Sequence, residues 1–145
     1  MASSSPGYVG TQDDVILPRV GAFIVDYIVS IIVGALGAIG LLIALGTPDV
    51  SEAGFVILAL VFILGYFVVL EGLFGRTVGK RLFGIVVVSR DGSAITLRQS
   101  AVRNLLWVID GLLNYVVGLI VMLIAEDRQR LGDLVAGTLV VRARR

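Results

Sequence analysis

Two long apolar stretches constrain this chain more than any other feature of its sequence. The first runs from Val20 to Leu45 and is interrupted only by Asp26 and Ser30, and the second, Ala53 to Leu70, carries no charge. About 20 helical residues cross the hydrocarbon core of a bilayer. Only 16% of the 145 residues are charged, whereas a soluble domain has about 25%. The sequence therefore predicts a membrane protein with two full transmembrane helices.

The placement of charge predicts how the chain is oriented. Residues 75–104 contain six Lys or Arg and a single acid, whereas the connection 46–52 contains two acids and no base. Lys and Arg collect on the cytoplasmic side of membranes. We therefore expect a multi-pass cell-membrane protein whose N-terminus and basic loop are cytoplasmic. By composition, residues 1–15 form a disordered tail, 16–141 the membrane domain and 142–145 a basic C-terminal tail.

A third apolar stretch, Leu105 to Ala125, contains Asp110, Gly111 and Asn114. It is long enough to cross the bilayer, and it could instead break near Asp110 into two short helices that enter and leave on one side. A full crossing would place five C-terminal arginines outside, against the usual bias. The sequence thus predicts an all-α membrane fold with two full spans and a third segment that is re-entrant or spanning, the former being favoured.

The basic loop also carries strand signals. Ile85 to Val88 is a β-branched run, and an Asp-Gly turn separates it from Ala94 to Leu97, a pattern typical of a small cytoplasmic β-hairpin. A second β-branched run at 138–141 follows a similar basic turn, and two such strands on one side could pair. Thr96 with Gln99 three residues later predicts a capping box that begins the next helix.

Asp26 is the most informative polar residue. It follows Arg19 by seven residues, so both side chains lie on one helix face. An acid within lipid costs about 3 kcal/mol on insertion scales and needs a partner or water. One interpretation is a carboxylate that binds a cation or a proton. The other is a structural ion pair that locks helices together, and the sequence leaves both open.

Other charged residues fall at related positions. Arg103 and Asp110 repeat the spacing of seven, so pairs of Asp26 with Arg103, or of Arg19 with Asp110, satisfy the geometry. Arg103 could instead extend to the interface, and Asp110 could cap a short helix. Taken alone, the position of Glu71 at the end of an apolar stretch is typical of an acid at the membrane interface. The position of Asp133 next to a glycine is typical of an acid in an exposed turn. The candidate ion-binding or buried-charge residues are Arg19, Asp26, Glu71, Arg103, Asp110 and Asp133.

Several functions are excluded or disfavoured by composition. The chain has no Cys and no His, which removes disulfides, imidazole metal sites and Ser-His catalysis. Gly75 to Arg81 resembles a phosphate loop but is one residue short and ends in Arg where a hydroxyl is needed. The basic loop lacks aromatic residues for stacking on bases. We expect no enzyme, cofactor, metal site or nucleic-acid partner.

Small residues recur along the first apolar stretch. Ser30, Gly34 and Ala38 follow one another every four residues. Stripes of this kind let helices approach closely in lipid. The stripe predicts helix packing, either within one chain or between copies of it.

In combination, four segments resemble the RDD family of small membrane proteins. They are Pro18–Asp26, Gly75–Gly84, Arg103–Leu106 and Gln129–Val141, and they occur in the family's order. The resemblance spans about residues 16 to 141.

The resemblance implies that Arg19, Asp26 and Asp133 are the arginine and the two aspartates for which the family is named. Family members often carry His before the last Asp, where this chain has Gly132. A proton-relay role for that histidine is therefore not carried over.

The resemblance also implies candidate activities, since some members are described as monovalent cation/proton antiporters. The first hypothesis is transport of a monovalent cation coupled to protons through intramembrane carboxylates, and it calls for a homo-oligomer because two or three helices make a poor pathway. The alternative is a non-transporting membrane scaffold or accessory module. Its buried charges would be structural, and its basic face would bind lipid or a protein partner.

Overall fold

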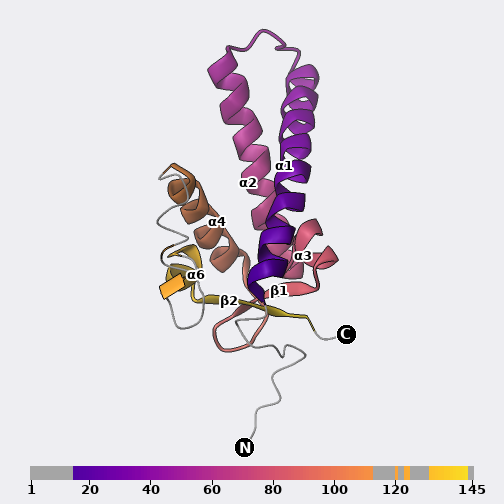
Figure 1. Cartoon of the computed structure of the whole chain (residues 1–145). Coiled ribbons are helices and arrows are strands. Elements are labelled where there is room, and N and C mark those ends of the chain that lie inside the picture. The colour runs from indigo at the N-terminus through magenta and orange to yellow at the C-terminus, as the bar shows by residue number, and fades with distance from the viewer. Residues whose placement is uncertain (1–14, 113–119, 121–122, 125–130, 144–145) are drawn as a thin grey trace, which may run out of the picture.

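The computed structural model describes residues 15–112, 120, 123–124 and 131–143, and this part of the chain is mostly helical (Figure 1). Two long helices form a hairpin, and the shorter elements gather around one end of it. That end holds the start of the first helix and the end of the second. The elements are α1 (Ile16–Leu45), α2 (Glu52–Phe74), α3 (Val78–Leu82), β1 (Ile85–Ser89), α4 (Leu97–Leu112), α6 (Leu131–Ala136) and β2 (Thr138–Arg142).

The two long helices confirm the two predicted apolar segments. Both are long and apolar enough to cross a membrane. Gly46, at a φ of 65°, ends α1 in the left-handed conformation that glycine adopts without strain. Ser51 begins α2, because its side chain accepts a hydrogen bond from the Gly54 N–H at 3.2 Å.

The small-residue stripe brings α1 and α2 together within the chain. A Cβ added at Gly34 would lie 2.7 Å from Cγ1 of Ile63 and 3.0 Å from the carbonyl oxygen of Ala59. A Cβ added at Gly37 would lie 2.5 Å from the ring of Phe62. The sequence left open whether the stripe packs within one chain or between copies. At Gly34 and Gly37 the structure shows packing within the chain, against α2.

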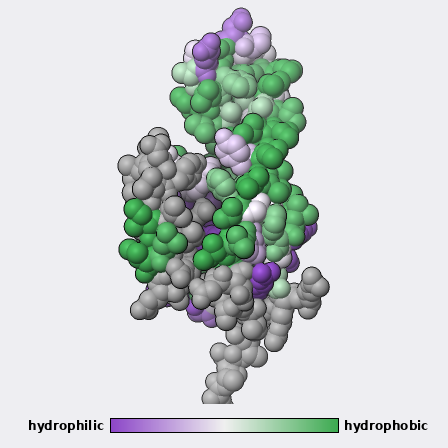
Figure 2. All heavy atoms as spheres, viewed as in Figure 1, coloured by the Kyte–Doolittle hydropathy of each residue, from purple (hydrophilic) through white to green (hydrophobic). Residues whose placement is uncertain are grey.

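Large apolar side chains cover the outside of this hairpin. Figure 2 shows a mainly hydrophobic surface over α1 and α2, with hydrophilic residues at the tip. Ile28, Ile43 and Ile57, for example, are all more than half exposed. An apolar surface of this extent indicates contact with a bilayer or with other protein.

The strands correct one prediction and confirm another. β1 pairs antiparallel with β2, with Val87 opposite Val140, as the two matching β-branched runs predicted. The predicted return strand at 94–97 is wrong, because Ala94 makes only an isolated bridge to Val88. Leu97 already belongs to α4. The residues after the Asp-Gly turn therefore lead into a helix and do not form a second strand of a hairpin.

The helix start at α4 follows the predicted capping box. The Gln99 N–H donates to the Thr96 hydroxyl at 3.2 Å, and the Thr96 N–H donates to the Gln99 side chain at 3.1 Å. As a result α4 begins before the apolar stretch that starts at Leu105, and it includes Asp110. Much of the predicted third segment, Leu105–Ala125, lies outside the described residues. Of the two predicted tails, only Val15 at the N-terminal side and residues 142–143 at the C-terminal side are described.

Replacement of Gly34 by Ala tests the close contact between α1 and α2. The added Cβ must displace Ile63 or the backbone of Ala59, so we expect a loss of about 1 to 3 kcal/mol of stability. The measurement is thermal unfolding in detergent micelles. Gly40→Ala is the matched control, because nothing lies within 4 Å of the added Cβ there. Equal melting temperatures for the two variants would contradict the contact.

Candidate functional site

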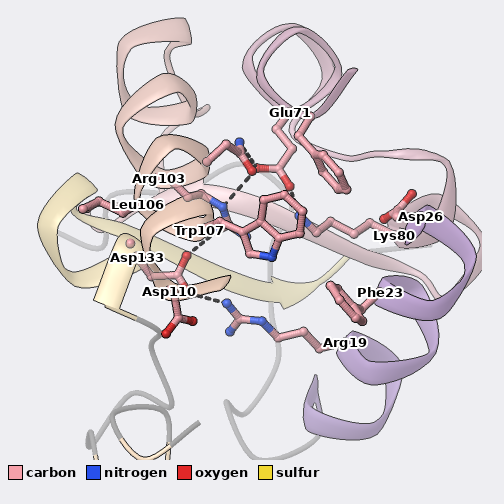
Figure 3. A pocket seen from close by; sticks show the side chains of 13 residues that line it. Arg19, Phe23, Asp26, Glu71, Lys80, Arg103, Leu106, Trp107, Asp110 and Asp133 are labelled. Carbon is pink, nitrogen blue, oxygen red and sulfur yellow. Dashed lines mark hydrogen bonds and ion pairs between the residues drawn. The ribbon is translucent and has the colours of Figure 1, made fainter. Parts of the chain in front are cut away.

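Five side chains of alternating charge form a continuous buried network. Each belongs to a different helix, as Figure 3 shows for the residues that it labels. Arg103 lies at the centre: its Nε is 3.0 Å from Oε2 of Glu71, and its Nη1 is 2.5 Å from Oδ1 of Asp133. Glu71 also pairs with Lys80, and Asp133 also pairs with Arg19. The network therefore joins α1, α2, α3, α4 and α6.

Burial makes this pairing necessary. No member of the network is more than 8% exposed. A buried charge without a partner costs several kcal/mol in desolvation, so each charge must be compensated. Neutral groups complete the shell: the Asn104 amide donates to Oε2 of Glu71 at 3.1 Å and to the Ser100 carbonyl at 2.9 Å. The Thr138 hydroxyl is 3.5 Å from Oδ1 of Asp133.

Asp26 is held differently, by neutral donors. The Tyr66 hydroxyl and the Gly79 N–H each donate to its Oδ1 at 2.8 Å, and the Thr77 hydroxyl donates to its Oδ2 at 2.5 Å. Asp26 is 1% exposed. Its negative charge is thus stabilised by hydrogen bonds, and no cationic group is in direct contact with it within the described part of the chain.

Two glycines allow the backbone to approach these sites. A Cβ at Gly79 would collide with the Ala22 carbonyl oxygen and with the Asp26 carboxylate. A Cβ at Gly132 would lie 2.6 Å from the carbonyl oxygen of Arg103. Glycine at these positions lets α3 dock on α1 and α6 dock on α4, so that the charged side chains meet.

The network and Asp26 surround a cavity of about 60 Å³. Such a volume has room for a few water molecules. The close-up in Figure 3 places Asp26 and Lys80 on one side of the pocket and Asp110 and Asp133 on the other. Three aromatic residues, Phe23, Phe67 and Trp107, also line it. All six candidate residues from the sequence line this one cavity: Arg19, Asp26, Glu71, Arg103, Asp110 and Asp133.

The pairing within the cavity differs from the expected one. The predicted pair of Asp26 with Arg103 is wrong, because Arg103 binds Glu71 and Asp133 while Asp26 takes neutral donors. Arg103 is buried and does not extend to a solvent-exposed interface. Asp110 is also buried, and it lies inside α4 rather than at the start of a helix.

Two acids have more central positions than their sequence context alone predicted. Asp133 is 1% exposed and bridges Arg19 and Arg103, so the expectation of an exposed turn acid is wrong. Glu71 is equally buried and contacts Lys80 and Arg103. The family resemblance indicated Asp133, whereas only the tertiary structure shows the importance of Glu71.

Sequence reasoning missed several residues of the site. Lys80 was counted only as one of the cytoplasmic basic residues, yet it is 7% exposed and pairs with Glu71. Tyr66, Thr77 and Asn104 gave no signal, because isolated hydroxyl and amide side chains have no characteristic spacing.

Burial strongly affects the ionisation of Lys80. Desolvation, together with the nearby guanidinium groups of Arg103 and Arg19, lowers the pKa of Lys80 well below its ordinary value of 10.5. Asp26 and Asp133 act in the opposite direction. The charged form of Lys80 therefore depends on the surrounding carboxylates.

Among the residues that the structure describes, no grouping suits a bound metal. Within residues 15–112, 120, 123–124 and 131–143, no set of three or more His, Cys, Asp or Glu is arranged to hold a metal ion. The polar groups that line the cavity are carboxylates, bases and the Asn104 amide.

Removal of the Glu71 charge tests whether the network stabilises the fold. Glu71→Gln leaves Lys80 and Arg103 with less compensation, so we expect a loss of about 3 kcal/mol or more of stability. Glu52→Gln is the control, because this acid lies exposed on the same helix and should cost less than about 1 kcal/mol. Thermal unfolding in micelles measures both. Similar small losses would show that the buried pairs are dispensable.

Comparison with known proteins identifies the family of this chain. The sequence model of the RDD family matches residues 15–137, a range that contains all six candidate ion-binding or buried-charge residues. The chain is also 37% identical over 73 residues to an uncharacterized protein of Bacillus subtilis, YckC. That match covers 48% of each chain, so the chain spans about half the length of this curated relative. No solved structure matches. The chain belongs to the RDD family, whose members are small membrane proteins.

Proposed function

We propose that this protein lies in the cell membrane with α1 and α2 as full spans and with the cavity at the cytoplasmic boundary of the bilayer. α1 has 30 residues and is about 45 Å long, whereas the hydrocarbon core is about 30 Å thick. From Leu45 back to Asp26 the helix carries no other charge, and this stretch alone is about 30 Å long. The charged start of α1 would therefore lie outside the hydrocarbon.

The third segment would then enter and leave the bilayer on one side. Arg103 precedes this segment and Asp133 follows it, yet they form an ion pair. β1 and β2, which also precede and follow the segment, pair with each other. Because both ends of the segment lie together, a single crossing does not fit these contacts. The basic loop supports a cytoplasmic position for this end.

Single cysteines test this topology, because the chain has none of its own. The variants are Thr47→Cys in the tip loop, Ser93→Cys in the basic loop, and a cysteine appended after Arg145. We expect a membrane-impermeant thiol reagent to label only Thr47→Cys in intact cells, and all three after permeabilisation. Labelling of the appended cysteine together with Thr47→Cys in intact cells would contradict the re-entrant segment.

Within this membrane protein we propose that the cavity exchanges a monovalent cation for a proton at Asp26. The supporting observation is that Asp26 lines the cavity and contacts only neutral donors. A carboxylate bound in this way can take up either a proton or a cation without first breaking an ion pair. The paired carboxylates of Glu71 and Asp133 hold the walls of the cavity and are less free to exchange.

Transport by this mechanism requires more than one copy of the chain. Beyond Ser30, the part of α1 that spans the bilayer carries only apolar and small residues, and so does the facing part of α2. One hairpin therefore offers no polar path across the hydrocarbon. We propose a homo-oligomer in which hairpins from several copies enclose the path between the cavity and the other side.

The test of exchange is proton flux driven by a sodium or potassium gradient in liposomes that contain the purified protein. We expect Asp26→Asn to reduce the flux to that of empty liposomes, because the exchanging charge is lost. Asp49→Asn, an exposed acid in the tip loop, serves as the matched control and should keep full flux. Undiminished flux from a folded Asp26→Asn protein would remove the proposal.

A second candidate function is a membrane module that does not transport. The observation that favours it is the ion-pair network, in which Arg19, Lys80 and Arg103 each contact a carboxylate and tie five helices together. Here Asp26 would only fasten α3 to α1. This alternative expects no cation-driven flux from the wild-type protein and a lower melting temperature for Asp26→Asn. Neither candidate involves catalysis or a cofactor.

A further inference from the structure

The short helix α3 has two unlike faces. Gly79 and Lys80 are buried against the rest of the protein, whereas Val78, Arg81 and Leu82 are exposed, Leu82 at 70%. The outward face of α3 therefore consists of two aliphatic side chains and one guanidinium group. Such a mixture is typical of elements at a membrane interface, where apolar side chains meet acyl chains and basic ones meet headgroups.

The depth of α3 follows from its contacts with α1. Gly79 packs on Ala22 and Asp26 of α1, and its N–H donates to the Asp26 carboxylate. Asp26 stands about 30 Å along the helix from Leu45, at the boundary of the hydrocarbon if α1 spans the bilayer as proposed. α3 then lies at the level of the lipid headgroups, and Phe83, packed against Gly21, extends the apolar surface there.

Two arginines at this level have no partner in the described part of the chain. Arg76 lies just before α3 and Arg81 lies within it, and neither makes a side-chain hydrogen bond or ion pair there. The Nε of Arg76 is buried and lacks an acceptor. That atom has almost no accessible surface, so a group outside the protein would meet the rest of the half-buried Arg76 side chain and the exposed Arg81. By contrast, all three bases at the cavity are paired.

We propose that Arg76 and Arg81 bind the phosphate of an anionic phospholipid, whose acyl chains lie along the exposed side chains of Val78, Leu82 and Phe83. Guanidinium groups suit phosphate because they donate several hydrogen bonds in one plane. The apolar residues beside them distinguish a lipid from a free phosphate ion. The inference rests on the proposed placement in the bilayer and does not depend on whether the protein transports a cation.

The test uses the full chain in a neutral detergent and native mass spectrometry to count bound lipids. The probes are phosphatidylglycerol and phosphatidylcholine with identical acyl chains. We expect one phosphatidylglycerol to bind in preference to phosphatidylcholine, and the double variant Arg76→Gln/Arg81→Gln to weaken its binding by roughly tenfold or more. Arg98→Gln is the control, because Arg98 is an exposed arginine on α4 and lies outside α3, and it should leave binding unchanged.

Three outcomes would overturn the inference. These are equal binding of the two lipids to the wild-type protein, an equal loss of binding in Arg98→Gln, and displacement of the lipid by excess inorganic phosphate. The cysteine labelling described above reports on membrane placement separately. Correct labelling combined with equal lipid binding would therefore reject the lipid site alone and leave the proposed topology standing. The melting temperature of each variant is measured as well, so that lipid binding is compared only between folded proteins.

Discussion

The Arg103 guanidinium is the group on which the end of the structure around the start of α1 depends. It lies between Glu71 and Asp133 and contacts both, and these acids in turn hold Lys80 and Arg19. Because every one of these charges is buried, the folded arrangement is stable only when all five helices are in place together. The network thus connects α1, α2, α3, α4 and α6 through buried charges.

Asp26 belongs to the same cavity but has a different physical role. Its hydrogen bonds come from a tyrosine, a threonine and a backbone amide, and none of these donors carries a charge. This separates the part of the site where each charge is neutralised by another from Asp26, whose hydrogen-bond donors are neutral. The separation is the physical basis for assigning exchange to Asp26 and structural roles to Glu71 and Asp133.

The site also explains why α3 lies where it does. The segment after Gly75 must turn back at once, because Gly75 adopts a positive φ of 69° and ends α2. Thr77 and Gly79 then fasten the chain to Asp26, and Lys80 enters the cavity. The outward residues of α3 are left at the proposed level of the lipid headgroups. One short helix therefore connects the buried charges with the surface that we propose to bind lipid.

The sequence by itself determined the elements whose cause is local or periodic. The long uncharged stretches dictated α1 and α2, the Thr96–Gln99 capping box dictated the start of α4, and the matching β-branched runs predicted β1 and β2. It also marked the charged residues of the cavity, because an acid in an apolar helix needs compensation. Only the tertiary structure decided which charges pair. Arg103 pairs with Glu71 and Asp133 rather than Asp26, and Lys80 enters the site, because these contacts depend on the docking of α3 and α6 through Gly79 and Gly132. The spacing of residues along a helix determines which of them share one face of that helix. It does not determine which neighbouring helix packs against that face.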